Sequence, residues 1–74
     1  MTAEEWIETF AADLGATPPT ETEIGKLLKL AAVAAHSSER IAAPLACWIA
    51  GREGLDLDEA ISRAERIGGD GEAG

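Results

Sequence analysis

The 74-residue sequence is poor in cysteine, histidine and aromatic residues. It has one cysteine, one histidine and no tyrosine, so Cys47 cannot form an internal disulfide. Its only aromatic residues are Trp6, Phe10 and Trp48, and most other apolar positions are Ala, Leu or Ile. A chain this short buries only about 60% of the surface that its unfolded form exposes. We therefore expect it to pack against another protein or a second copy of itself.

Basic residues are also scarce. Six Lys and Arg stand against fourteen Asp and Glu, which gives a formal net charge of -8. Nucleic acids and anionic membranes both require a basic face on the proteins that bind them. We therefore expect no nucleic-acid partner and no membrane partner. The acidic balance suits solubility, or a protein partner with a basic patch.

Long apolar runs are missing as well. No stretch approaches the roughly 20 residues that a helix needs to cross a bilayer. Glu4, Glu5 and Glu8 interrupt the region where a signal peptide would be apolar. Together with the single cysteine, these absences predict a cytoplasmic protein. Alternation of β-branched residues with a period of two is absent too, so no strand is expected.

A capping box marks the start of the first expected helix. Thr2 can accept a hydrogen bond from the backbone N–H of Glu5, while the Glu5 side chain reaches back to the N–H of Thr2. The helix is expected to end before Gly15. Its apolar residues recur at helical spacing and form one face: Trp6, Ile7, Phe10, Ala11 and Leu14. Residues 16–19 then form a linker, because consecutive prolines cannot continue a helix.

A second capping box, Thr20 with Glu23, starts the next helix. Its expected apolar face consists of Ile24, Leu27, Leu28, Ala31 and Ala35. Residues 30–35 are apolar on nearly every side, which predicts that this helix is the central one. Gly25 either weakens the helix or lets another helix cross closely. We expect the helix to end near residues 36–38.

Two shorter helices are expected in the second half of the chain. Pro44 suits a first helical turn, so we predict a helix over about residues 43–52, with an inward face of Leu45, Trp48 and Ile49. Asp56 followed by Glu59 is a third capping pattern. The helix after it is expected to end at the glycines 68 and 69. Its apolar stripe consists of Leu57, Ala60, Ile61, Ala64 and Ile67.

These signals together predict an all-α fold. We expect a compact bundle of four helices, antiparallel or orthogonal, in a single domain over residues 1–69. Residues 70–74 are small and polar, which predicts a flexible tail.

The reactive side chains do not combine into a complete catalytic or metal site. His36 could transfer protons, but its place near a helix end favours a capping role there. Cys47 lies within a helix, where a cysteine more often serves as a small apolar residue than as a nucleophile. One His and one Cys match no zinc-binding spacing. The acidic residues near Asp56 lack the glycine and the later glutamate of a calcium loop. We therefore predict a protein that is not an enzyme, with no catalytic residue, no metal and no cofactor.

The junction between the second and third helices is the candidate interaction or ligand-binding site. It contains His36, Arg40, Pro44 and Trp48. Arg40 could fork onto a carboxylate or phosphate, or else pair with Glu39 or the last carbonyls of the second helix. The leading hypothesis is an interaction module on which another protein docks. One alternative is a nucleotide or pterin stacked on Trp48, with a phosphate at Arg40. A further alternative is a self-associating structural domain.

The stretch from Ala35 to Leu45 resembles the central motif of a small helical domain family of unknown function, found mainly in actinobacteria. That motif is a helix ending in Ala-His and then a segment ending in Arg-Pro-Ala-Ala-Pro-Leu. The start of the chain, Glu4-Glu5-Trp6-Ile7, is similar to the acidic, Trp-containing helix that opens the family. The resemblance extends over about residues 4–51. Ile41 replaces the usual proline, and the helix over residues 56–67 looks like an addition.

The resemblance also implies a biological setting. Members of that family occur alone, or beside or fused to the guanylyltransferase of molybdenum-cofactor synthesis. It therefore implies an accessory role near molybdenum-cofactor assembly, with an enzyme of that synthesis as a partner. It implies no catalytic residue.

Overall fold

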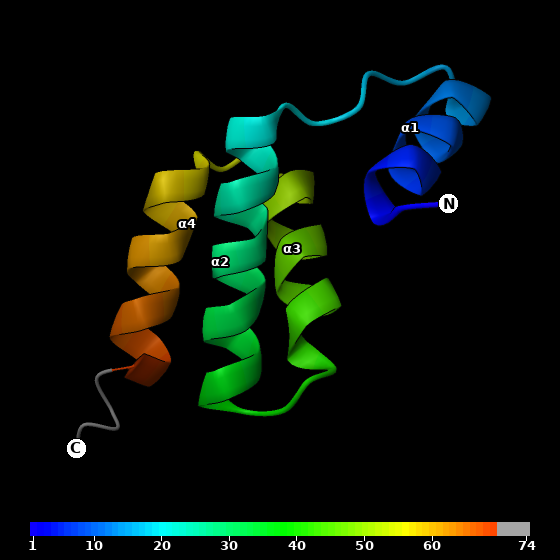
Figure 1. Ribbon diagram of the computed structural model, residues 1–74. Coiled ribbons are helices and arrows are strands. Elements are labelled where there is room, and N and C mark those ends of the chain that lie inside the picture. The colour runs from blue at the N-terminus through cyan, green and yellow to red at the C-terminus, as the bar shows by residue number, and fades with distance from the viewer. Residues whose placement is uncertain (70–74) are drawn as a thin grey trace.

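A computed structural model describes residues 1–69, which contain four α-helices and no strand (Figure 1). The helices are α1 (Ala3–Leu14), α2 (Glu21–Ser37), α3 (Ala42–Glu53) and α4 (Leu57–Ala64), and a short π-helical turn, η1 (Glu65–Gly69), follows α4. The predicted all-α bundle of four helices is confirmed. The predicted flexible tail, residues 70–74, lies outside the described residues.

Local hydrogen bonds fix where three of the helices begin. At the start of α1, the N–H of Thr2 donates to the Glu5 carboxylate over 2.8 Å, and the N–H of Glu5 donates to the Thr2 hydroxyl over 3.0 Å. Thr20 and Glu23 form the same reciprocal pair at the start of α2, over 2.8 and 3.1 Å. At α4, the Asp56 carboxylate accepts from the backbone N–H of residue 59 over 3.1 Å. The predicted capping boxes at Thr2 and Thr20 are therefore confirmed. The third forms only in part, because the Glu59 carboxylate accepts from Arg63 over 2.7 Å and not from the N–H of Asp56.

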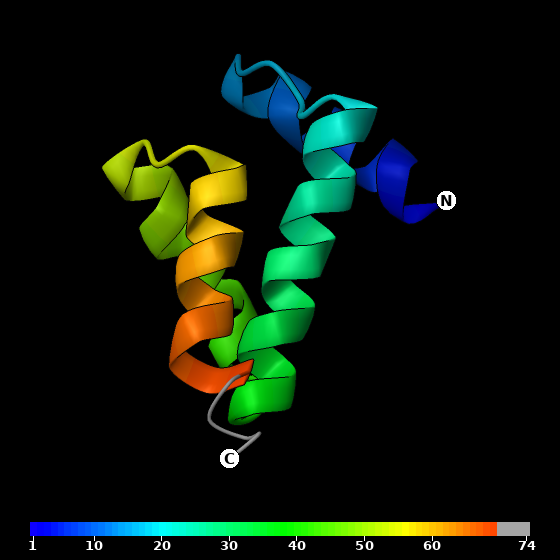
Figure 2. The same cartoon turned by 90° about the vertical axis from the view of Figure 1, so that its left-hand side faces the viewer.

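Helices α2, α3 and α4 run in alternating directions and lie side by side (Figures 1 and 2). α2 packs against both α3 and α4, so the prediction that it is the central helix is confirmed. A Cβ atom added at Gly25 would meet no other atom within 4 Å, so this glycine does not serve a close helix crossing. None of the helices in residues 1–69 is long and apolar enough to cross a bilayer.

The core of this three-helix unit is small. Leu30 of α2 is its most buried residue, with 3% of its surface exposed, and it meets Ala50 of α3 and Ala60 and Ile61 of α4. Cys47 and Ala64 pack against this cluster from its edge. Small side chains therefore bring the three helices together, and Leu30 and Ile61 supply most of the buried bulk.

The predicted inward face of α3 is wrong. Leu45, Trp48 and Ile49 have 58%, 60% and 49% of their surface exposed. The side of α3 that packs on the core carries Cys47 and Ala50 instead. Because α3 is apolar on both sides, periodicity alone did not distinguish them. The small side was selected because it lets α3 approach α2 closely.

The end of the fourth helix also differs from the prediction. The α-helical turns end at Ala64, and the next five residues form the wider π-helical turn η1. An α-helix of 3.6 residues per turn would have returned Ile67 to the apolar stripe. The wider turn moves it away, and Ile67 has 84% of its surface exposed.

Helix α1 lies to one side of the other three, at the end of an extended connection that contains Pro18 and Pro19 (Figures 1 and 2). Ala11 is its only buried residue. The rings of Trp6 and Phe10 stack on each other, with centroids 5.1 Å apart, and both remain about half exposed. The amphipathic face predicted for this helix exists, but most of it meets solvent.

Candidate functional site

The four residues of the predicted site are distributed over the α2–α3 junction. His36 lies in the last turn of α2, Arg40 in the connection, and Pro44 and Trp48 one turn apart on α3. All four are exposed. The Ser38 hydroxyl donates to the carbonyl of Ala34 over 2.9 Å, which closes the end of α2 without help from His36. The two grooves described below are lined by none of the four, so their role as a site stays a prediction.

Trp48 has a cationic neighbour that the sequence analysis did not identify. The guanidinium carbon of Arg52 lies 4.4 Å from the centroid of the Trp48 ring. This is a cation–π contact between residues four apart on one helix face. The spacing of four residues between Trp48 and Arg52 was the signal in the sequence from which this contact could have been predicted. Arg52 covers part of the Trp48 ring, and the predicted pairing of Trp48 with Arg40 around a phosphate stays a prediction.

The exposed side of α3 forms a continuous apolar face, which we call the α3 face and define as Leu45, Trp48 and Ile49. Spacings of three and four residues place these side chains together on one helix surface. Arg52 borders the α3 face at its C-terminal end. Large apolar residues gathered on one exposed surface of a small domain are typical of protein–protein contacts.

Cys47 lies on the opposite side of α3, toward α2. Its thiol donates a weak hydrogen bond to the carbonyl of Leu27 over 3.8 Å. Partial burial raises the pKa of the Cys47 thiol above its ordinary value of 9.0. The thiolate, which is the nucleophilic form, is thereby disfavoured at neutral pH. The environment of Cys47 fits the small apolar role expected for it.

An open groove, which we call the α1–α2 groove, separates α1 from the first half of α2. Its volume is about 520 Å³. Apolar side chains from both helices and from the linker form most of its lining: Ala3, Ile7, Pro18, Pro19, Ile24, Leu27 and Leu28. Its remaining lining residues are all acidic: Glu4, Glu8 and Glu21. Periodicity and motifs did not predict this groove; its signals in the sequence were the apolar face of α1 and the paired prolines 18 and 19.

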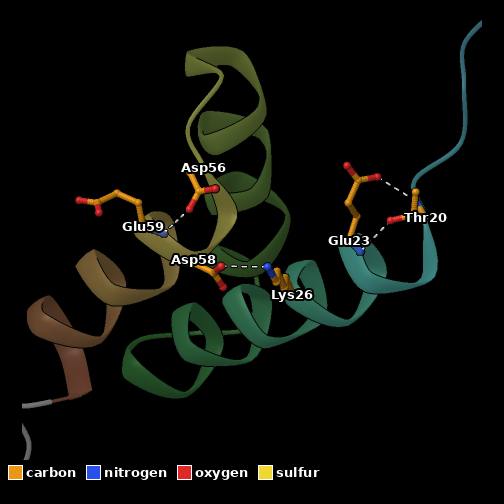
Figure 3. Close-up of polar contacts among 6 residues, drawn as sticks. All are labelled: Thr20, Glu23, Lys26, Asp56, Asp58 and Glu59. Carbon is orange, nitrogen blue, oxygen red and sulfur yellow. Dashed lines mark hydrogen bonds and ion pairs between the residues drawn. The ribbon is translucent and has the colours of Figure 1, made fainter.

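A second, more polar groove lies between the start of α2 and the connection from α3 to α4. Its volume is about 310 Å³ and it is lined in part by Thr20, Lys26 and Asp56. Figure 3 shows the polar contacts around it, in which Lys26 points across to Asp58 at the start of α4. The hydrogen bond to Asp58 and the charge of that carboxylate raise the pKa of Lys26 above 10.5. This groove is therefore bordered by an ion pair that joins two helices.

Metal-ligating residues do not cluster in the part of the chain that the structure describes. No three side chains of His, Cys, Asp or Glu come together there in a way that could hold a metal ion. Asp56 and Glu59 are instead joined by the helix cap described above.

A family model described as "Domain of unknown function (DUF6457)" matches residues 1–69. No curated protein and no solved structure matches the chain. The predicted resemblance to a domain family of unknown function is confirmed to that extent. The prediction that the helix over residues 56–67 is an addition to the family domain is wrong, because the match extends through it to residue 69. The predicted link to molybdenum-cofactor synthesis stays a prediction.

Proposed function

The chain belongs to the DUF6457 family, and we propose that it is a non-enzymatic protein-interaction module that binds a partner on the α3 face. One observation carries the proposal: α3 turns its large apolar side chains to solvent and packs small ones on the core. Trp48 and Leu45 are each more than half exposed, whereas Ala50 is buried and Cys47 packs at the edge of the core.

The α3 face has the composition of an interface centre. Tryptophan and arginine are the residues most enriched among those that dominate binding energy, and here they are in contact as Trp48 and Arg52. Leu45 and Ile49 surround the ring with aliphatic surface. Burying these side chains against a partner would remove apolar surface from water, which favours association.

The resemblance described above suggests the first partner to test, the guanylyltransferase of molybdenum-cofactor synthesis. We place the domain beside such an enzyme in the cytoplasm, as an accessory protein without catalytic residues of its own. His36, Arg40 and Pro44 lie at the junction where α3 begins; His36 and Arg40 would form a polar rim of the α3 face, and Pro44 would extend its apolar surface. In the ligand-binding alternative, Trp48 would stack on a pterin or nucleotide, but neither described groove adjoins this ring.

The proposal is tested by measuring binding of the purified domain to the guanylyltransferase by biolayer interferometry. Trp48→Ala is expected to weaken binding by about tenfold or more, as for a central interface tryptophan. Trp6→Ala is the matched control, because Trp6 is about equally exposed but lies on α1. Equal binding by wild type and Trp48→Ala would exclude the α3 face. No binding by the wild type would exclude this partner.

Light scattering over a range of concentrations provides the complementary measurement. A monomer at all concentrations is expected if the α3 face is reserved for a different protein. Concentration-dependent dimers that Trp48→Ala abolishes would instead show that the occupant of this face is a second copy of the chain.

A further inference from the structure

We infer that the α1–α2 groove binds an amphipathic helix of another protein whose apolar stripe is flanked by Lys or Arg. The inference rests on the proposed function in treating the domain as an interaction module. It concerns a different surface, since no α3 residue lines the groove.

The floor and walls of the groove suit the apolar side of such a helix. Ile7 of α1 and Leu28 of α2 remain exposed, at 37% and 65% of their surface, although both line the groove. A partner helix recognised in a groove presents apolar anchors at intervals of three, four and seven residues.

The charge of the groove defines the flanks of that partner. Glu4, Glu8 and Glu21 line it, and no lining residue is basic. Glu4 and Glu8 are four residues apart, which places them on one edge of α1. Within residues 1–69 none of these three carboxylates forms an ion pair or a side-chain hydrogen bond, while the neighbouring Glu5 and Glu23 are engaged in caps. Lys or Arg beside the apolar stripe of the partner would neutralise them.

A second copy of the chain does not meet this requirement. α1 carries four acidic residues and no basic one. α2 and α3 have as many Lys and Arg as Asp and Glu, and α4 has one more acidic residue than basic. None of the four helices therefore has a net positive charge. With a net charge of -8, two copies also repel each other. The fitting occupant is a different, basic protein segment.

A synthetic peptide provides the probe. It has about 18 residues, or five helical turns, with leucines on one face and lysines on the others, and carries fluorescein for anisotropy measurements. We expect it to bind the full chain with an affinity that decreases as salt is added, because salt screens the carboxylates. A peptide with glutamate in place of lysine tests the charge, and a lysine peptide with the leucines scrambled tests the apolar stripe. Equal binding of the lysine and glutamate peptides would overturn the inference.

A pair of charge-matched variants tests where on the chain the peptide binds. Leu28→Glu places a carboxylate in the groove, and Leu45→Glu places one on the α3 face; both leucines are more than half exposed, so both variants are expected to fold. Each variant makes the chain more acidic by one charge, so general attraction to lysine increases equally. We expect about tenfold weaker binding for Leu28→Glu only, as for loss of an interface anchor. Equal affinities of the two variants would place the peptide elsewhere.

A second pair tests the acidic lining. Glu4→Gln/Glu8→Gln neutralises two carboxylates of the groove, and Asp13→Asn/Glu39→Gln neutralises two that do not line it. Both double variants have the same net charge. We expect weaker peptide binding and a smaller salt dependence only for the groove variant. If the apolar floor is required but the acidic pair is not, the groove takes an uncharged apolar ligand, and the basic-helix inference is wrong.

Failure of this inference is distinguishable from failure of the proposed function. The guanylyltransferase experiment depends on Trp48, and the peptide experiment depends on Leu28. If Leu28→Glu no longer binds the peptide while Trp48→Ala still binds the enzyme, the groove is supported and the α3 face is excluded. If Leu28→Glu still binds the peptide while Trp48→Ala no longer binds the enzyme, only the groove is excluded.

Discussion

The Lys26 ammonium donates a hydrogen bond to the Asp58 carboxylate over 2.9 Å and thereby joins α2 to the first turn of α4 (Figure 3). The two residues are 32 positions apart in the chain. Lys29 of α2 approaches Glu65 of η1, the turn that follows α4, over a longer 3.9 Å. Lys26 is therefore the better-placed of the two lysines that connect α2 with the C-terminal part of the fold.

Replacing Lys26 is expected to change how stability depends on pH. The folded state holds the Lys26 proton more tightly than the unfolded state, because Asp58 raises its pKa above 10.5. The stabilisation is therefore fully present below pH 10.5 and decreases as the pH rises through the folded pKa. Urea unfolding at pH 7 and at increasing pH above 10.5 should show a stability deficit of Lys26→Met at pH 7 that shrinks as the pH rises. Lys29→Met is the control, and an equal deficit in both variants would contradict the prediction.

Leu30 is expected to dominate the stability of the three-helix unit. Leu30→Ala removes the most buried large side chain and should lower the free energy of unfolding by about 2–5 kcal/mol. Leu45→Ala makes the same chemical change on the exposed α3 face and should alter it by less than about 0.5 kcal/mol. Urea denaturation followed by circular dichroism measures both. Similar losses in the two variants would mean that the α3 face is covered in solution.

Two glycines are expected to respond in opposite directions to alanine. Gly25 lies inside α2, and an added Cβ would meet nothing within 4 Å, so Gly25→Ala should stabilise the protein by about 0.5–1 kcal/mol. Gly54 ends α3 in the left-handed conformation, with φ of 66°. Gly54→Ala should destabilise it by about 1–2 kcal/mol, the cost of that conformation for other residues. Thermal melts compare the two variants directly, and stabilisation by both would refute the assigned backbone conformation at Gly54.

The two capping boxes are expected to differ in importance although their geometry is the same. Thr20→Ala removes the cap of the central helix and should lower global stability by about 1 kcal/mol. Thr2→Ala removes the cap of α1, which shares little packing with the other helices, so its effect should be confined to faster amide exchange within α1. Hydrogen exchange combined with urea unfolding separates the two outcomes. A global loss from Thr2→Ala as large as that from Thr20→Ala would show that α1 unfolds together with α2.

The features that could be predicted from the sequence are those that depend on neighbours in the chain. The caps at Thr2 and Thr20 involve residues three positions apart, so the starts of α1 and α2 were predicted correctly. The inward side of α3 was predicted wrongly, because it is determined by contact with α2. The Trp48 side and the Cys47 side are both apolar, so the pattern within α3 does not distinguish them.

The candidate sites show the same division. The positions of His36 and Arg40 at a helix junction could be predicted locally. The α1–α2 groove could not, because it arises from where the linker places α1, and Ile7 and Leu28 are 21 positions apart in the sequence. Patterns along one helix do not contain that placement.

The small core has a calorimetric consequence. The heat-capacity increment of unfolding and the denaturant m-value both scale with the surface that unfolding exposes. Here Leu30 and Ile61 are the only large side chains that are deeply buried within residues 1–69. Both quantities should therefore be low for a chain of this length, with a shallow stability curve and a broad melting transition. A gradual melt of this protein would reflect how little apolar surface the folded chain conceals, and would not indicate a partly unfolded starting state.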